Sequence, residues 1–147
     1  MSIKTLKAEV KSAGKEYKVE CSARNKSFIL DEAEELGGSN GGMNPGEAFL
    51  SALGSCKYIV AKMFCGKLNI NLQEIKLEME GEIDPDGLNE KNNNVKIGFS
   101  KITTNYFIKA NNTKEEIENF IEYIEDHCPM KDTIYNRPNM GAKINIL

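Results

Sequence analysis

Short runs of alternating polar and apolar residues open the chain. Ile3–Val10 and Glu16–Ser22 are predicted to be strands joined by a turn at residues 12–14, and Lys26–Asp31 is predicted to be a third strand. Residues 36–42 then hold four glycines in seven positions. Glycine at that density disfavours regular structure, so a flexible loop is expected there.

A long apolar helix is predicted to begin after Asn44. Asn is a favourable N-cap, Pro45 suits the first helical position, and Glu47 stands where a capping box needs an acid. Apolar residues lie on most sides of this helix as far as about Leu68. A helix that is apolar nearly all round belongs inside a protein, so we expect it to be the central element.

Alternation with a period of two returns after this helix. Residues 75–83 alternate apolar and charged side chains, which is typical of a half-buried strand in an antiparallel sheet. Residues 84–87 (DPDG) predict a turn. A second alternating strand is expected from Val95 to Ile108.

The last third of the chain predicts two helices and a strand. Thr113 begins a capping box with Glu116, and the helix is expected to stop at residues 127–129, because the residue before a proline avoids the α region. A short helix is predicted from Pro129 to Asn136, and a strand at residues 142–146. The order of elements predicts an α+β fold with a largely antiparallel sheet.

Composition narrows the class of protein. The chain has 147 residues, of which 40% are hydrophobic and 28% charged, with a net charge of −3. We expect one domain over residues 1–147 with its own core. A mildly acidic chain with dispersed lysines is not expected to bind nucleic acid or an anionic membrane. The sequence shows neither a signal peptide nor the roughly 20 apolar residues that span a bilayer, so a cytoplasmic location is expected.

The four cysteines are Cys21, Cys56, Cys65 and Cys128. In a cytosolic chain of this size, an even count does not indicate a disulfide framework. No CxxC occurs and the chain has one His, so a zinc site is not expected. Catalysis, redox sensing and core packing remain as roles.

Local context separates these cysteines. Cys56 lies mid-helix beside the small residues Gly54 and Ser55, which allow close approach of another group, although a buried free Cys is often a simple core residue. Cys128 lies where one helix ends and another begins, and unpaired N–H groups there favour a thiolate, with His127 as a possible aid. A turn-capping role for Cys128 is equally compatible with the sequence.

The other two cysteines are not expected to take part in the chemistry. Cys65 stands nine residues after Cys56. At about 100° per residue, the two side chains face opposite sides of one helix and cannot pair within it. Cys65 is therefore expected to be a packing residue. Cys21 alternates within a predicted strand and is assigned no role.

Two motifs resemble those of the OsmC/Ohr family. Residues 42–56 (GMNPGEAFLSALGSC) resemble the central helix of that family, and residues 127–133 (HCPMKDT) resemble its second cysteine motif. The order of elements matches along nearly the whole chain. The resemblance implies antiparallel sheets wrapped around a long central helix in an intertwined homodimer.

The resemblance also implies a chemistry. Cys56 corresponds to the thiolate that attacks the O–O bond of an organic hydroperoxide, and Cys128 to the thiol that condenses with the resulting sulfenic acid. A dithiol reductant, lipoyl-linked in well-known members, restores both thiols. No metal or organic cofactor is implied.

Family peroxidases hold an arginine near the attacking sulfur by means of a glutamate. The chain has two arginines, of which Arg24 is the preferred candidate and Arg137 the alternative, and either could be a surface charge. In the organic-hydroperoxide branch, the glutamate directly follows the proline, where this chain has Gly46. Glu47 comes one residue later, and capping already explains it. The sequence is closer to the OsmC-like branch.

Three functions compete at this stage. The first is a thiol peroxidase acting on organic hydroperoxides through Cys56 and Cys128. The second is a redox-responsive or ligand-binding protein on the same fold with weak or no peroxidase activity, which the shifted glutamate favours. The third is a structural or interaction role in which both cysteines are incidental.

Overall fold

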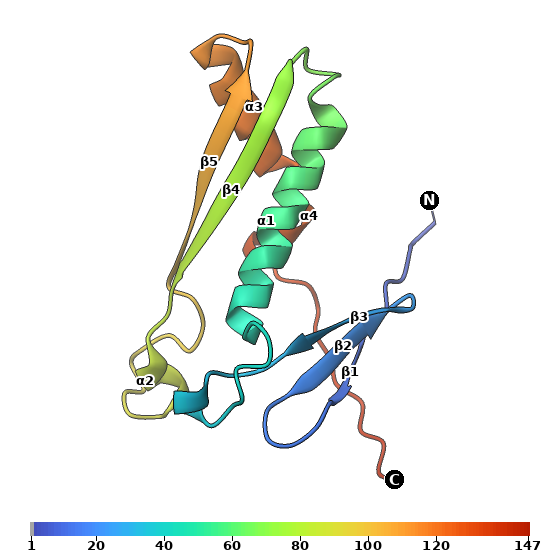
Figure 1. The fold of residues 1–147 in the computed structure, drawn as a ribbon, viewed down its shortest axis with the longest axis vertical. Helices are drawn as coiled ribbons and strands as arrows, with labels where there is room; N and C mark the ends of the chain where they lie inside the picture. The colour runs from blue at the N-terminus through green and yellow to red at the C-terminus, as the bar shows by residue number, and fades with distance from the viewer. Residues whose placement is uncertain (1) are drawn as a thin grey trace. The chain divides into compact units, whose positions relative to one another are not determined.

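The computed structural model describes residues 2–147, which form two compact units. The first unit ends at Phe49, and the second spans Leu50–Leu147. Figure 1 shows three strands, the long helix, two strands and two helices in the predicted order, with a short helix added between β4 and β5 and the predicted last strand absent from the described chain, and every strand pair is antiparallel. The α+β fold class is therefore confirmed. Within residues 2–147, no helix combines the length and the apolar character that crossing a bilayer requires.

The first unit contains a three-stranded sheet in the order β1-β2-β3. These strands are Glu9–Ser12, Val19–Ala23 and Lys26–Leu30. Arg24 and Asn25 connect β2 to β3 with φ angles of 49° and 61°. Left-handed backbone at both central residues matches the right-handed twist of the paired strands in a tight hairpin.

The predicted strand Ile3–Val10 is wrong over most of its length. Its ladder begins at Glu9, which lies opposite Ser22, and β2 ends one residue later at Ala23. A strand extends only while a neighbouring strand offers backbone partners. The alternation of residues 3–8 therefore had no ladder to join within the described chain.

The glycine-rich loop is tied to one buried carboxylate. Glu34–Leu36 form a single turn of 3-10 helix, and the glycines that follow lie outside regular structure, as predicted. Asp31, only 3% exposed, accepts hydrogen bonds from the Ser39 hydroxyl at 2.6 Å and from the Gly41 N–H at 3.0 Å. A Cβ at Gly38 would lie 2.0 Å from the carbonyl oxygen of Glu32, so the loop requires glycine there.

The long helix α1 spans Pro45–Phe64. Its predicted capping box is confirmed, because the Glu47 N–H donates to Asn44 Oδ1 and the Asn44 N–H donates to Glu47 Oε2, each at 2.9 Å. The helix ends four residues before the predicted Leu68. Asn69 has a φ of 56°, a left-handed conformation that directs the chain into the next strand.

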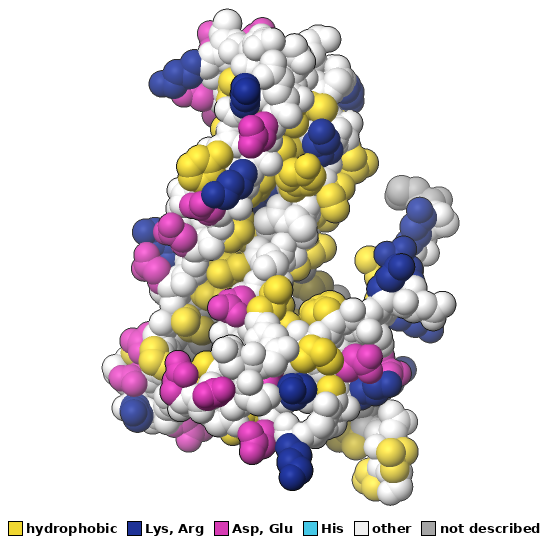
Figure 2. Space-filling view, viewed as in Figure 1, with side chains coloured by type: hydrophobic (Ala, Val, Ile, Leu, Met, Phe, Trp, Pro, Cys, Tyr) yellow, Lys and Arg dark blue, Asp and Glu magenta, His cyan; other side chains and the backbone are white. Residues whose placement is uncertain are grey.

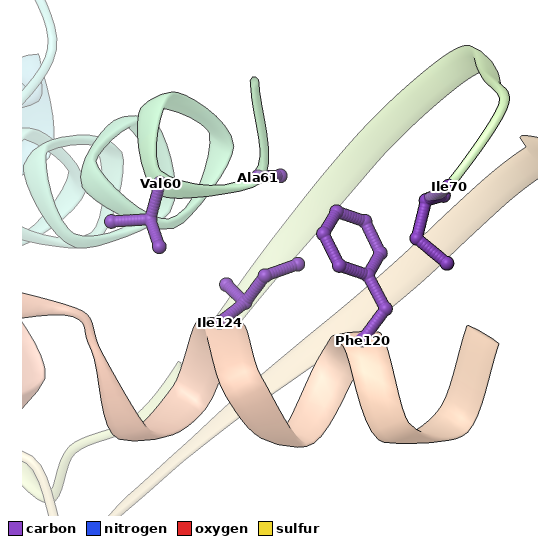
Figure 3. Close-up of a cluster of buried hydrophobic side chains, with 5 residues drawn as sticks. All are labelled: Val60, Ala61, Ile70, Phe120 and Ile124. Atoms are coloured by element: carbon purple, nitrogen blue, oxygen red, sulfur yellow. The ribbon is translucent and has the colours of Figure 1, made fainter. Parts of the chain in front are cut away.

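In the second unit, helices pack on a long two-stranded ribbon. β4 (Leu72–Glu82) pairs with β5 (Lys101–Ala110), and α3 (Lys114–Asp126) follows. Figure 3 shows the apolar core, in which side chains of α1 and α3 face one another beside the start of β4. The core residues are Val60, Ala61, Ile70, Phe120 and Ile124.

Cys128 lies at the junction of the last two helices. The capping box of Thr113 and Glu116 that begins α3 is confirmed. The next helix, α4 (Pro129–Tyr135), begins directly after Cys128, which is its N-cap. Both helix boundaries therefore lie within a residue of their predicted positions.

Two other predictions about the second unit are wrong. β5 begins at Lys101 rather than Val95, because its partner β4 ends at Glu82, opposite Lys101. In the described chain, residues 142–146 form no strand, and Ile144 and Ile146 are almost fully exposed. Alternation produces a strand only where a ladder partner is present. The predicted turn at residues 84–87 falls within a short helix, α2 (Pro85–Leu88).

Candidate active site

Tertiary packing brings Cys56 and Cys128 together. Cys56 is half-buried on α1, and Cys128 is 2% exposed at the start of α4. The Cys128 thiol lies close enough to Cys56 to raise its pKa, although more than 70 residues separate the two in the sequence. Both cysteines are free thiols in the structure. Their proximity meets the first requirement for a disulfide, because sulfur atoms must lie close before they can bond.

Close packing of α1 on β4 sets the position of Cys56. Gly54 is buried, and a Cβ there would lie 2.8 Å from the side chain of Met79 on β4. The helix can therefore approach the strand closely two residues before the cysteine. Gly54, one of the small residues beside Cys56, therefore serves the contact between helix and strand.

Backbone N–H groups at the start of α4 reach both sulfur atoms. The Lys131 N–H donates to the Cys128 sulfur at 3.4 Å, and the Met130 N–H donates to Cys56. Burial nevertheless raises the pKa of the Cys56 thiol, and the neighbouring Cys128 thiol raises it further, while the Met130 bond opposes this shift. The environment formed by this single chain therefore favours the protonated form of Cys56.

A group of five polar residues lies close to Cys128, whose sulfur accepts from the N–H of one of them, and we call it the Glu125 cluster. Its members are Lys57, Thr104, Tyr106, Glu125 and Lys131. Lys57 is 4% exposed, and its Nζ donates to Thr104 Oγ1 and to Glu125 Oε1, both at 2.7 Å. The Tyr106 hydroxyl donates to the same Oε1 at 2.6 Å, and Lys131 Nζ lies 3.2 Å from Oε2.

The cluster keeps Glu125 ionised. Burial alone would raise the pKa of Glu125, but hydrogen bonds from Lys57 and Tyr106 and the charges of the two lysines lower it overall. The pKa of Tyr106 is raised, first by burial and then by its bond to the carboxylate. With Tyr106 neutral, two ammonium groups and one carboxylate give the cluster a net charge of +1.

A cavity of about 250 Å³ opens beside this cluster. Lys57, Glu125 and Lys131 contribute to its polar wall, and Leu53, Ile102 and Ile134 contribute to its apolar wall. All of these residues belong to the second unit. A small organic molecule with an apolar body and a polar end suits such a lining.

The structure places the other predicted site residues elsewhere along the chain. Arg24 lies exposed in the β2–β3 turn of the first unit, and Glu47 is occupied by the cap of α1. Arg137 is exposed just after α4. The His127 ring stacks on Tyr123 at 3.7 Å between centroids, and its Nδ1 lies 2.8 Å from the Tyr123 carbonyl oxygen.

The remaining cysteines lie outside the site, as predicted. Cys65 follows α1 and is partly buried against the apolar core, and its thiol donates to the Lys62 carbonyl oxygen at 3.5 Å. Cys21 lies in β2, opposite Val10 and Phe28. Among residues 2–147, no group of three or more His, Cys, Asp or Glu side chains is arranged to hold a metal ion.

Sequence reasoning missed every member of the Glu125 cluster. One signal was available, because Lys57 is the only charged residue between Glu47 and Lys62 in an otherwise apolar helix. A lysine in that position needs a buried partner, since an unpaired buried ammonium group is strongly unfavourable. Nothing in the sequence identified Glu125 as that partner among its acidic neighbours.

Comparison with known proteins identifies the family of this chain. A family model described as OsmC-like protein matches residues 38–143. A hydroperoxide reductase of Mycoplasma genitalium is 28% identical over 108 residues, which is 71% of each chain.

Two solved structures show the same fold. The OsmC-like protein of Mycoplasma pneumoniae superposes with a TM-score of 0.79 at 18% identity, over 91% of this chain and 89% of that one. An organic hydroperoxide resistance protein of Legionella pneumophila gives a TM-score of 0.65 at 19% identity, over 92% and 93% of the two chains. With the family model spanning both cysteines, this chain belongs to the OsmC-like protein family.

Proposed function

We propose that this protein is a thiol peroxidase that reduces organic hydroperoxides. The observation that carries the proposal is the contact between the Cys56 and Cys128 thiols. The names of the relatives support the substrate class, since one is a hydroperoxide reductase and another an organic hydroperoxide resistance protein. The cavity beside the Glu125 cluster offers a lining that suits the organic part of such a substrate.

The reaction proceeds in three steps. The Cys56 thiolate attacks the O–O bond of ROOH, which breaks to leave Cys56 as a sulfenic acid and, after protonation, releases ROH. The Cys128 thiol then condenses with the sulfenic acid, forming a disulfide and one water molecule. A dithiol reductant exchanges with that disulfide and returns both cysteines to thiols, itself becoming a disulfide.

The first step needs a cation near Cys56. A positive charge lowers the pKa of a thiol and polarises the peroxide. Arg24 is our predicted residue, with Glu47 as its predicted partner. Changing Arg24 to Gln should slow the oxidation of Cys56, whereas the same change at Arg137, the other arginine, should not. Equal rates in the two variants would remove Arg24 from the site.

We further propose that the protein acts as a homodimer. Figure 2 shows hydrophobic side chains gathered along α1, where Tyr58, Ile59 and Met63 are exposed by 41%, 56% and 68%. An exposed apolar helix face of this kind usually marks an interface. Light scattering coupled to size-exclusion chromatography should give twice the 16.4 kDa chain mass. A single-chain mass at micromolar concentration would contradict this proposal.

Two observations favour a second function. The raised pKa of Cys56 and the use of Glu47 in a helix cap both weaken a peroxidase site. A redox-responsive or ligand-binding protein with slow peroxide turnover would tolerate both features. In that case, the cavity beside the Glu125 cluster would bind an organic ligand without turnover.

Steady-state turnover of cumene hydroperoxide and hydrogen peroxide, with dihydrolipoamide as reductant, separates the two functions. A peroxidase should consume cumene hydroperoxide faster than hydrogen peroxide. The Cys56→Ser variant should show no turnover, and the Cys128→Ser variant should stop after forming one sulfenic acid per chain. Cys65→Ser is the matched control and should keep the native rate. Turnover no faster than that of a free thiol, and unaffected by Cys56→Ser, would favour the second function.

A further inference from the structure

One carboxylate connects the two elements that carry the cysteines. Glu125, on α3, binds Lys57 of α1 through Oε1 and Lys131 of α4 through Oε2, at 2.7 Å and 3.2 Å. Its Oε1 also accepts from the Tyr106 hydroxyl of β5. Glu125 thus links α1 to three elements, β5, α3 and α4, that lie more than 35 residues later in the sequence.

Each lysine lies within three residues of one of the two cysteines. Lys57 directly follows Cys56, and Lys131 stands in the first turn of α4, where its own N–H binds the Cys128 sulfur. The neighbouring Met130 N–H binds Cys56. A shift of α4 away from Glu125 would therefore move the donors of both sulfur atoms together.

The contacts are sheltered enough to resist such a shift. The side chains of Lys57, Glu125 and Lys131 are exposed by 5%, 24% and 27%, in contrast to the 89% and 60% of the surface pair Lys114–Glu118. Hydrogen bonds between charged groups are about twice as strong as neutral ones, and water competes for them less when they are sheltered. Disulfide closure is sensitive to small displacements, because its bond length and dihedral angle are narrowly defined.

We propose that Glu125 and Lys131 are positioning residues that hold α4 against α1, so that Cys128 can close a disulfide with Cys56. Neither residue takes part in bond making. The inference rests on the cysteine pair of the proposed function, but it does not require peroxide turnover. Oxidised glutathione can drive the same closure, in which two protein thiols and one glutathione disulfide give one protein disulfide and two glutathione thiols.

The test is to measure the equilibrium constant of that exchange in glutathione buffers. All variants carry Cys21→Ser and Cys65→Ser, so that only Cys56 and Cys128 can form a disulfide within the chain. Lys131→Met removes the link to α4 and leaves the Lys57–Glu125 pair in place. It should lower the constant about tenfold, as expected for the loss of one charged hydrogen bond. Lys131→Arg should restore most of it. Lys114→Met, which removes an exposed helical ion pair, should leave it within twofold, roughly the scale of a surface pair.

Glu125→Gln provides the second variant, and it should lower the constant at least as much as Lys131→Met. A merely structural role predicts lower melting temperatures with an unchanged equilibrium constant in the folded protein, and that result overturns the proposal. Failure of the native pair to form a disulfide in oxidised glutathione also overturns it. If the native protein follows these expectations but does not turn over cumene hydroperoxide, the proposed function is wrong and the positioning role stands.

Discussion

Asp31 and Glu125 are two sheltered carboxylates with lowered pKa values, and they are stabilised in different ways. Neutral donors from its own loop surround Asp31, with Ser39 and Gly41 eight and ten residues away. Charged and phenolic donors surround Glu125, with Lys57 and Tyr106 68 and 19 residues away. One carboxylate organises a local loop, and the other holds distant elements together.

The difference shows how the same group can serve two purposes. At Asp31, hydrogen bonds lower the pKa to about 2, led by the Ser39 hydroxyl, and they order a glycine-rich segment. At Glu125, ammonium groups outweigh the effect of burial, and the ion pairs join α1, α3 and α4. Removing Asp31 should therefore loosen one loop, whereas removing Glu125 should weaken the packing of the second unit.

The largest effect is expected from Glu125→Ala. This change leaves the Lys57 ammonium buried with Thr104 as its one remaining partner in the cluster. An uncompensated buried charge destabilises a protein by about 3 kcal/mol or more. Urea denaturation at pH 7 should show a loss of about 3 kcal/mol in the free energy of unfolding. Glu122→Ala, an exposed position on the same helix, is the control, and equal losses in both variants would contradict the role given to Glu125.

A smaller effect is expected from Asp31→Asn. The amide can accept at one atom only, so either the Glu32 N–H, which binds Oδ1, or the donors of Ser39 and Gly41, which share Oδ2, lose their partner. The melting temperature should fall by several degrees, and a protease should cut faster within residues 32–42. Glu34→Gln, at an exposed residue of the same segment, should change neither property.

The loss of stability at acid pH should also depend on Asp31. Its folded pKa of about 2 lies below the ordinary unfolded value, so its stabilisation is complete above the unfolded pKa of about 3.9 and is lost as the pH falls through about 2. Asp31→Asn removes this titration. The variant should therefore lose less stability than the native protein between pH 4 and pH 2, as measured by urea midpoints. Parallel pH profiles would show that Asp31 titrates normally.

The smallest effect is expected from Tyr106→Phe. The change removes one hydrogen bond to Glu125 but leaves both lysines paired with the carboxylate. The free energy of unfolding should fall by about 1 kcal/mol, the usual contribution of one such bond. Tyr58→Phe, on the exposed face of α1, is the matched control. A loss as large as that of Glu125→Ala would mean that the hydroxyl, rather than the charges, holds the cluster together.

Sequence reasoning succeeded where the cause of a structure is local. Asn44 and Glu47, like Thr113 and Glu116, satisfy N–H groups within their own first turn, so their spacing alone predicts a helix start. Pro129 limits the residue before it, so the break at Cys128 was also predictable. The family was recognised from the two short motifs that surround Cys56 and Cys128.

Sequence reasoning failed where a segment forms a strand only if it finds a partner elsewhere in the chain. The strands expected at residues 3–8, 95–100 and 142–146 have suitable alternation but no ladder within the described chain. Alternation reports which face of a strand would be buried, and it does not report whether a neighbour exists.

The sequence by itself determined the helix caps and the family, because a cap depends on residues within one turn and each family motif is a short continuous segment. Only the tertiary structure decided that Cys56 meets Cys128 and that Lys57, Tyr106 and Lys131 converge on Glu125. Several acidic residues of α3 could have served Lys57 equally well by charge. The packing of α1, β5, α3 and α4 selects Glu125, because charged groups pair strongly only where the fold brings them within hydrogen-bonding distance and excludes water.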